Sequence, residues 1–297
     1  MRKVLNGVIL MAFVCFASQA WAGWWNKGSF SPEGGFKGRY VPPLTNIMYN
    51  ESPYITTEAS LWYVYQTIPE KSITQGGHLN LGAAQARFAL TDRLAIIATK
   101  DGYADVHFGT ALADTHGFMN IAAGLKYALW QNPQQDAILT VGGRYEIPTG
   151  DISTSGVSLQ GHGNGLTDLF ISGAKSWDKF GLEANIGTNI ASNQRDNTSQ
   201  FHYSLHADYA LTEKFFPIIE FNGFTPMKEG HRVELNLDGH DALNLGSSGL
   251  GTTATIAEGF RYVITKNVQV GAAWEQSITA RKDLLDQRAT VNLLLKF

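Results

Sequence analysis

Cysteine, charge and long apolar runs are all scarce in this chain of 297 residues. The one cysteine, Cys15, excludes a disulfide framework and a multi-thiolate metal site. Charged residues make up 16%, against about 25% in an average soluble domain. Beyond the N-terminus, no apolar stretch reaches the roughly 18 residues of a membrane-spanning helix. With 23 Lys+Arg against 26 Asp+Glu there is no basic excess, so we expect no nucleic-acid partner.

Glycine and aromatic residues are abundant instead. The chain has 31 Gly and 11% aromatics, with a mean hydropathy of −0.12. This aromatic content argues against a disordered chain. Together with the glycines it is typical of an all-β protein.

Residues 1–22 have the three parts of a secretory signal peptide. Arg2 and Lys3 form the basic start, residues 8–16 form a short apolar core, and residues 20–22 read Ala-Trp-Ala, a small-x-small cleavage site. We therefore predict export of the chain and removal of this segment, which takes Cys15 with it. An exported chain without spanning helices can still cross a membrane as a closed barrel, which satisfies every backbone group.

Strict alternation of apolar and polar residues is the main structural signal. It is clearest at the end of the chain, where one face carries Ala289, Val291, Leu293, Leu295 and Phe297. The same period recurs at 119–129, 139–147, 182–190, 201–209 and 268–274. Strands of about ten residues with one apolar and one polar face are typical of transmembrane barrels. A soluble β-sandwich also alternates, but it does not predict a terminal strand ending in Phe297, which resembles the assembly signal of bacterial outer-membrane barrels.

Short and long connections alternate along the chain. The short ones include 90–93, 177–180, 211–214 and 264–267. The long ones cover about 67–77, 101–116, 148–165, 192–200, 226–248 and 280–285. Outer-membrane barrels have short periplasmic turns and long outer loops.

Counting the elements between these connections predicts an antiparallel up-and-down barrel of twelve strands over residues 54–297, with ten or fourteen as alternatives. The strands are expected at 56–66, 78–90, 93–100, 117–130, 137–147, 166–176, 181–191, 201–211, 215–225, 250–263, 268–279 and 287–297. The second and tenth strands fit least well. Gln85 and Arg87 share a face with Leu79 and Leu81, and Glu258 shares one with apolar neighbours, so we expect a β-bulge or a different register there.

Residues 23–53 lie outside the barrel pattern. One interpretation is a disordered periplasmic extension. The other is a plug folded into the lumen, which the density of aromatic and apolar residues such as Phe36, Tyr40, Leu44 and Tyr49 favours.

If the apolar faces meet lipid, the polar faces line the lumen. The residues that we predict to line a transport path are Lys126, Arg144, Glu146, Glu183, His202, His206, Asp208 and Glu220. A barrel of twelve strands lies between the packed eight-stranded and the open sixteen-stranded cases, so we expect a narrow bore. A slight excess of acids on this face suggests a weak preference for cations.

No pattern for catalysis or for a cofactor stands out. His202 and Ser204 resemble a pair used by outer-membrane phospholipases, but Tyr203 and Leu205 place the apolar face on the other side, and no Asn-Gly follows Ser204. His202 and His206 lie about 13 Å apart along a strand and cannot share one metal ion. We therefore predict no enzyme activity, no cofactor and no metal.

Two short motifs resemble a known family. Tyr145-Glu146-Ile147-Pro148-Thr149-Gly150-Asp151 ends one strand, and Leu90-Thr91-Asp92-Arg93-Leu94 forms an earlier turn. They resemble the exported barrels that are named after the MetA pathway of phenol degradation. The resemblance implies an outer-membrane barrel that passes hydrophobic or aromatic compounds. It implies no catalytic residues.

These observations predict a narrow passive channel or transporter for small molecules in the cell outer membrane. Its expected partners are membrane lipid, lipopolysaccharide, a small-molecule solute and the barrel-assembly machinery, the last through Phe297. The alternatives are a non-conducting structural or adhesive surface barrel and, with less support, a lipid-modifying enzyme.

Overall fold

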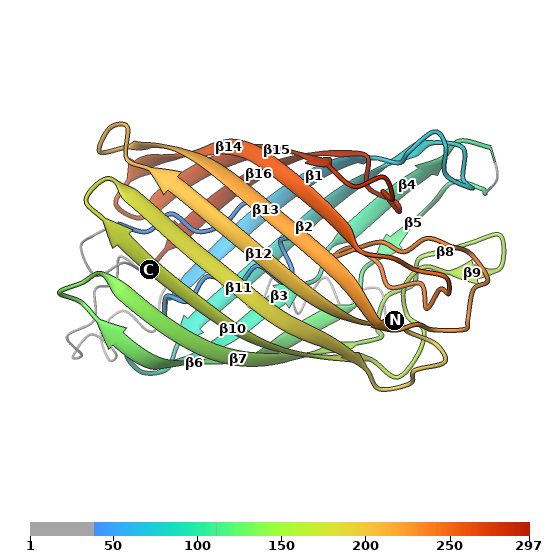
Figure 1. Ribbon diagram of the computed structural model, residues 1–297, viewed down its shortest axis with the longest axis horizontal. Coiled ribbons are helices and arrows are strands. Elements are labelled where there is room, and N and C mark those ends of the chain that lie inside the picture. Colours follow the sequence, from blue (N-terminus) through green and yellow to red (C-terminus); the bar gives the residue numbers. More distant parts are fainter. Residues whose placement is uncertain (1–38, 111) are drawn as a thin grey trace.

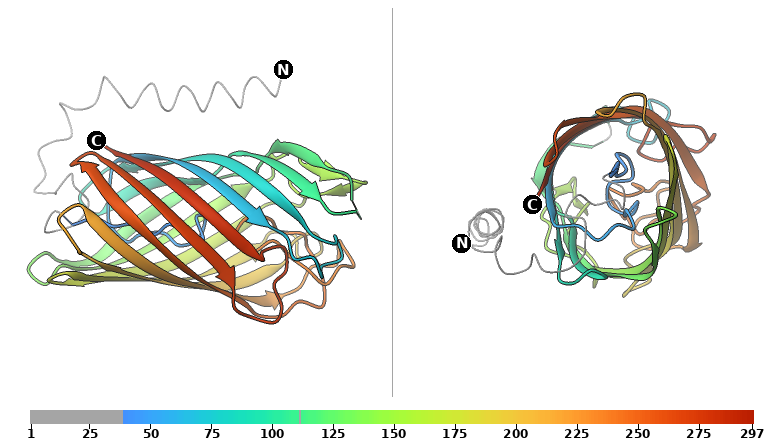
Figure 2. Two further views of the ribbon diagram at one scale, coloured as in Figure 1. Left: turned by 90° about the horizontal axis from the view of Figure 1, so that it is seen from above. Right: turned by 90° about the vertical axis from the view of Figure 1, so that its left-hand side faces the viewer.

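The strands form one sheet that closes on itself. The computed structural model describes residues 39–110 and 112–297. β1 (Glu58–Thr67) pairs with β2 (Gly77–Ala89) on one side and with β16 (Gln287–Lys296) on the other, which closes the cylinder seen in Figure 2. All strand pairings are antiparallel, and neighbours in the wall follow chain order. The predicted fold class, a transmembrane up-and-down barrel of twelve strands, is confirmed.

The predicted strand positions agree closely with those observed. The other wall strands are β3 (Leu94–Lys100), β6 (Ile121–Asn132), β7 (Ala137–Ile147), β10 (Leu166–Trp177), β11 (Phe180–Ala191), β12 (Ser199–Tyr209), β13 (Phe215–Lys228), β14 (Thr253–Thr265) and β15 (Val268–Ser277). The short turns gather at one end of the barrel and the long loops at the other (Figure 1). We call these the short-turn end and the long-loop end. No helix in residues 39–110 and 112–297 is long and apolar enough to cross a membrane.

One predicted loop, 101–116, is largely strand. β4 (Tyr103–Phe108) and β5 (Thr115–Phe118) extend β3 and β6 toward the long-loop end, and β4 pairs with β2. The chain is interrupted at Asp101 and Gly102, where Gly102 has a φ of +119° and the Asp101 carboxylate accepts the Ala84 backbone N–H at 2.9 Å. The alternation shifts by one residue just before this point, at the bulge between Ala98 and Lys100 in the β3–β6 ladder, so the extension does not continue the pattern of β3. A short hairpin, β8 (Ser153–Thr154) and β9 (Val157–Ser158), lies in the next long loop.

The outer face of the wall is apolar and exposed. Leu61, Ile219 and Val291 are 52%, 60% and 51% exposed. A soluble protein buries such side chains. A lipid-facing surface needs them outside, and because the backbone groups are paired around the closed sheet, the wall leaves no polar edge in the hydrocarbon.

The second and tenth strands need no bulge to explain their patterns. β2 pairs with β1 in one continuous register, so Leu79 and Leu81 face inward together with Gln85 and Arg87. The two leucines pack in a buried apolar cluster with loop residues that include Leu237 and Leu243. The interior is apolar near the long-loop end because loops fold into it. In β14, Glu258 lies on the outer face, where it is exposed.

Two segments occupy the inside of the barrel. Residues 39–57, here called the inner segment, run through the lumen, where Figure 2 shows them in blue within the ring of strands. Residues 229–252, here called the inward loop, connect β13 and β14 at the long-loop end, and most of residues 237–247 are buried. The predicted signal peptide and residues 23–38 of the predicted N-terminal segment lie outside the described residues.

Candidate functional site

The alternation of the strands places all eight predicted lumen residues on the inner face. Each of them is buried, with at most 7% of its surface exposed. They are Lys126 on β6, Arg144 and Glu146 on β7, Glu183 on β11, His202, His206 and Asp208 on β12, and Glu220 on β13. Most of them contact the inner segment, and the contacts fall into four groups around the wall.

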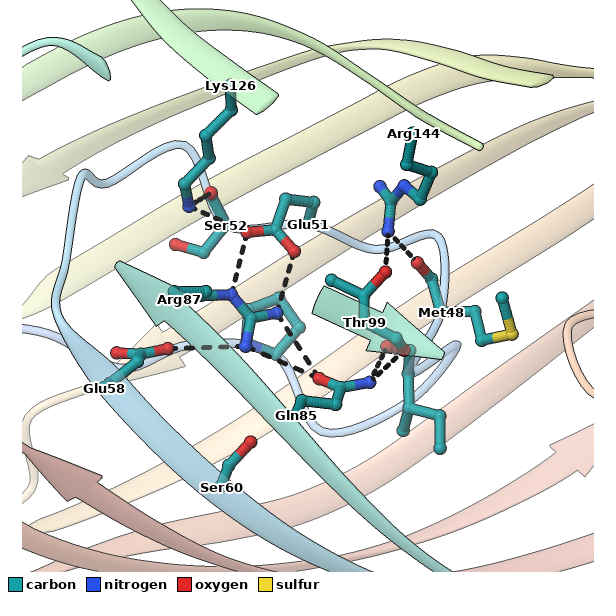
Figure 3. Close-up of polar contacts among 12 residues, drawn as sticks. Met48, Glu51, Ser52, Glu58, Ser60, Gln85, Arg87, Thr99, Lys126 and Arg144 are labelled. Carbon is teal, nitrogen blue, oxygen red and sulfur yellow. Dashed lines mark hydrogen bonds and ion pairs between the residues drawn. The ribbon is translucent and has the colours of Figure 1, made fainter. Parts of the chain in front are cut away.

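The first group holds Glu51, the single acidic residue of the inner segment (Figure 3). The Arg87 guanidinium donates from Nε to Oε1 at 2.8 Å and from Nη2 to Oε2 at 2.7 Å. Lys126 Nζ donates to Oε1 at 2.7 Å and to the Ser52 carbonyl at 2.8 Å. A bidentate, charge-assisted pair of this kind is among the strongest contacts that a protein makes. We call Arg87 and Lys126 the carboxylate clamp.

The second group lies on β7 and β12. Arg144 donates to the Met48 carbonyl and forms an ion pair with Asp168 at 2.8 Å. His202 Nε2 is hydrogen-bonded to the other Asp168 oxygen at 2.7 Å. The His202 ring also stacks on Tyr49, with 4.7 Å between the ring centroids. The wall therefore binds the inner segment through one backbone carbonyl and one aromatic ring.

The third group binds a turn of the inner segment. The Glu220 carboxylate accepts the backbone N–H groups of Leu44 at 2.8 Å and Thr45 at 2.7 Å, as well as the Thr45 hydroxyl. His206 Nδ1 lies 2.7 Å from the same carboxylate. Two unpaired backbone donors of a non-strand segment are thereby satisfied in the barrel interior.

The fourth group holds the start of the inner segment. Arg261 on β14 donates to the carbonyls of Pro42 and Pro43, and Gln269 on β15 donates to the Tyr40 carbonyl at 2.9 Å. Pro42 and Pro43 cannot donate to a strand ladder, which disfavours strand pairing here, and the carbonyls of this stretch accept from wall side chains instead.

The remaining predicted residues differ in their partners. Asp208 accepts from the Arg39 guanidinium at 2.6 Å. Glu146 binds Lys100 at 2.8 Å, on the wall itself. Glu183 lies opposite His206 in the β11–β12 ladder. Glu146 is thus tied to the wall rather than to the inner segment.

Sequence analysis missed the residues that bind the segment most tightly. Arg87 and Glu51 were absent from the predicted path. Arg87 could have been predicted, because it lies on the same face of the second strand as Gln85, and that face points inward. No local pattern identifies Glu51, since its partners on β2 and β6 lie 36 and 75 residues along the chain.

The long-loop end is closed by different contacts. Arg288 on β16 binds the Asp241 carboxylate of the inward loop through two nitrogens, at 2.8 and 3.1 Å. The His240 ring stacks on Phe224 with 5.1 Å between centroids. Burial, with Arg288 nearby, lowers the pKa of His240 to about 4. Burial raises the pKa of Asp238 to about 6.

Two small cavities lie between these segments and the wall. One small cavity lies between Ile47 and Met48 of the inner segment and Ala242 of the inward loop. A second lies beside the clamp, lined by Tyr40, Trp62, Arg87 and Arg261 among others. Each holds about one water molecule. Neither cavity has room for a solute in this conformation.

His202 and Ser204 are not arranged for catalysis. His202 binds Asp168, whereas the Ser204 hydroxyl donates to Asn222 at 2.7 Å and accepts from Asn46 at 3.0 Å. A serine nucleophile needs a hydrogen bond to its base, and none joins these two side chains in the described residues.

A family model described as the putative MetA-pathway of phenol degradation matches residues 55–284. The chain belongs to this family. Membership confirms the resemblance drawn from the two short motifs, and the match covers the barrel from the end of the inner segment to the last long loop.

Solved structures with the same fold are outer-membrane proteins. An outer membrane channel from Pseudomonas putida F1 is 13% identical, with a TM-score of 0.57 over 87% of this chain and 100% of that one. The NanC porin is 7% identical, with a TM-score of 0.50 over 82% of this chain and 100% of that one. At these identities the likeness establishes the fold, an outer-membrane barrel. No curated protein matches the sequence.

Proposed function

We propose that this barrel is a passive channel for small molecules across the outer membrane, and that the inner segment closes it. One observation supports this most directly. Charged wall residues such as Arg87, Lys126 and Glu220 bind the inner segment, which belongs to no strand of the wall. A barrel whose only role was structural would gain more by pairing these charges with one another, because each buried charge needs a partner.

The family description and the two motifs point to hydrophobic or aromatic solutes, and we adopt this class as part of the proposal. The predicted export signal, the contacts with lipopolysaccharide and the role of Phe297 in assembly stay predictions. We predicted a weak preference for cations from the acid excess. The clamp favours the opposite preference once Glu51 leaves it.

A second candidate is a non-conducting surface barrel. The observation in its favour is that both ends of the lumen are filled, at the long-loop end by a buried apolar cluster and the Arg288–Asp241 pair. In that case the loops would be the functional surface.

Single-channel recording in a planar bilayer separates the two. The chain without residues 1–22 is compared with the same chain lacking residues 24–53. We expect little or intermittent current from the first and steady current from the second. Each barrel is first shown to be folded by its resistance to unfolding in cold detergent. The absence of current from both forms would then refute the channel and favour the surface barrel.

A further inference from the structure

We propose that the carboxylate clamp is the binding site for the carboxylate group of a small monocarboxylate solute, and that Glu51 is a built-in substitute for that solute. The proposal deepens the proposed function and rests on it, because a solute reaches the clamp only if the inner segment moves. It names the solute class and the residues that recognise it.

The geometry of the clamp is that of a carboxylate site. Both oxygens of Glu51 are bound by one planar guanidinium, and Lys126 binds one of them again from the β6 side (Figure 3). Glu51 is 2% exposed, and Lys126 and Arg87 are 1% and 9% exposed. The arginine fork matches a planar carboxylate, whereas a lysine alone would accept any anion.

The charges around the clamp require an anion. When the inner segment withdraws, Lys126 loses both Glu51 and the Ser52 carbonyl. Arg87 keeps the Glu58 carboxylate at 3.5 Å and the Gln85 side-chain oxygen at 3.4 Å. Among the described residues, Glu58 is then the one acid left in an ion pair with the clamp, with Glu183 acting on Lys126 from outside contact distance. A buried charge without a partner is strongly unfavourable. A single carboxylate restores the balance that Glu51 provides now.

The space beside the clamp has one apolar wall in a polar lining. Trp62 and Leu294 supply the apolar wall, and the other wall residues of the adjoining cavity are polar or charged, namely Glu58, Ser60, Gln85, Arg87, Arg261 and Asn292. The Trp62 indole is held in place because Nε1 donates to the Ser60 hydroxyl at 2.8 Å. Tyr40 belongs to the inner segment, so the cavity widens when the segment leaves. A carboxylate that carries a ring or a short alkyl chain would place its charge in the clamp and its body against Trp62.

Competition between solute and Glu51 follows from this arrangement. Both use the same two cations, so a solute that occupies the clamp releases the main ionic contact of the inner segment. Monocarboxylates should therefore loosen the segment, and neutral compounds of the same shape should not.

The test uses Glu51→Ala in the full chain without residues 1–22, refolded in detergent micelles. This substitution removes the carboxylate and leaves the clamp in place. The probe is benzoate, with benzamide as the neutral compound of nearly the same shape. The measurement is the shift of the thermal unfolding midpoint with probe concentration, since a ligand that binds the folded state stabilises it by mass action.

We expect benzoate to bind Glu51→Ala at least tenfold more tightly than the wild-type chain, where Glu51 competes. Benzamide should give no saturable shift with either. Adding Arg87→Met to Glu51→Ala should abolish the benzoate effect. Equal shifts with benzoate and benzamide, no saturable shift with benzoate, or a shift that survives Arg87→Met would each overturn the proposal.

A second measurement does not depend on the folding of Glu51→Ala. A single cysteine, Asn46→Cys, is placed on the inner segment of the otherwise wild-type chain, and its alkylation rate is followed. Benzoate should raise this rate at least threefold and benzamide should not. Equal rates with both compounds would contradict the competition. Both tests measure binding in micelles, so a silent bilayer recording would refute conduction without deciding whether the clamp binds carboxylates.

Discussion

The two segments inside the barrel are held in different ways. The inner segment is held by polar contacts, among them the Arg87–Glu51 pair and the Glu220 carboxylate on two backbone N–H groups. The inward loop packs Leu237 and Leu243 in a larger apolar cluster, and it adds the Arg288–Asp241 ion pair and hydrogen bonds such as those between Asn244 and the Thr198 backbone. A carboxylate solute can compete with Glu51 for the clamp, whereas it cannot replace the apolar packing of Leu237 and Leu243.

This difference suggests a division of roles. Polar contacts in a buried site are specific and can be exchanged for equivalent contacts with a ligand. Apolar packing depends on area removed from water and has little directionality. The inner segment therefore suits a ligand-sensitive closure, and the inward loop suits a closure that opens through thermal motion.

The largest expected effect comes from Arg87→Met. It leaves Glu51 buried with Lys126 as its one cation, and breaking a buried pair costs about 3 to 5 kcal/mol. The inner segment should then open at least about a hundredfold more often, since about 1.4 kcal/mol is a factor of ten, and this is measured as the alkylation rate of Asn46→Cys. Arg93→Met, in an exposed turn, is the matched control and should change nothing. Equal rates in the two variants would mean that the clamp does not hold the segment.

A smaller effect is expected from Leu243→Ala. Leu243 is 5% exposed in the apolar cluster, and losing its side chain should cost about 2 to 3 kcal/mol. The alkylation rate of a cysteine in the inward loop, Ser247→Cys, should rise, while that of Asn46→Cys stays the same. Leu211→Ala, at an exposed turn, is the control. A similar rise at both cysteines would show that the two closures open together.

The inward loop should respond to acid through His240. Its pKa in the closed loop is about 4, below the usual 6.5, so the open loop binds more protons between these values. The closed loop therefore loses stability as the pH falls through this window, by about 1.4 kcal/mol per pH unit, and the loss levels off below about 4. Asp238, whose pKa is raised to about 6, acts in the opposite direction over part of the same range.

His240→Phe keeps a ring on Phe224 and removes the titration. The ratio of Ser247→Cys alkylation rates, wild-type over His240→Phe, cancels the pH dependence of the reagent. We expect this ratio to rise on acidification from pH 6.5 to 4. A flat ratio would rule out a contribution of His240.

The smallest expected effect comes from Gly271→Ala. A Cβ there would lie 2.7 Å from a methyl group of Leu44 in the inner segment, so the segment must shift slightly, at a cost of about 1 kcal/mol. A Cβ at Gly82, with no atom within 4 Å, gives the matched control Gly82→Ala. The Asn46→Cys rate should rise severalfold in the first variant alone. Equal alkylation rates in Gly271→Ala and Gly82→Ala would mean that Leu44 can move away from the added methyl group without weakening the other contacts of the inner segment.

The wall was predictable because its pattern is local. Alternation over residues such as Leu139 to Ile147 reflects one lipid face and one inner face, and a period of two fixes which residue is which. The same rule placed Lys126, Arg144 and Glu220 on the inner face. It failed at the bulge between Ala98 and Lys100, because one extra residue reverses the inward and outward positions of the strand extension that follows.

The partners inside the lumen were not predictable. Which wall residue meets Glu51 depends on how the inner segment runs across strands that are far apart in sequence, and alternation says nothing about that path. Leu79 and Leu81 were misread for a related reason. Their face is set by β2, but the apolar surroundings on that face come from distant loops.

The central claim is that the inner segment closes the channel, and tethering the segment to the wall tests it most directly. Asn46 and Ser204 are hydrogen-bonded at 3.0 Å, so Asn46→Cys with Ser204→Cys can be bridged by a short, reducible cross-linker. We expect no current from the bridged protein in a planar bilayer and openings after reduction. Equal current before and after reduction, or none in either state from a folded barrel, would contradict it.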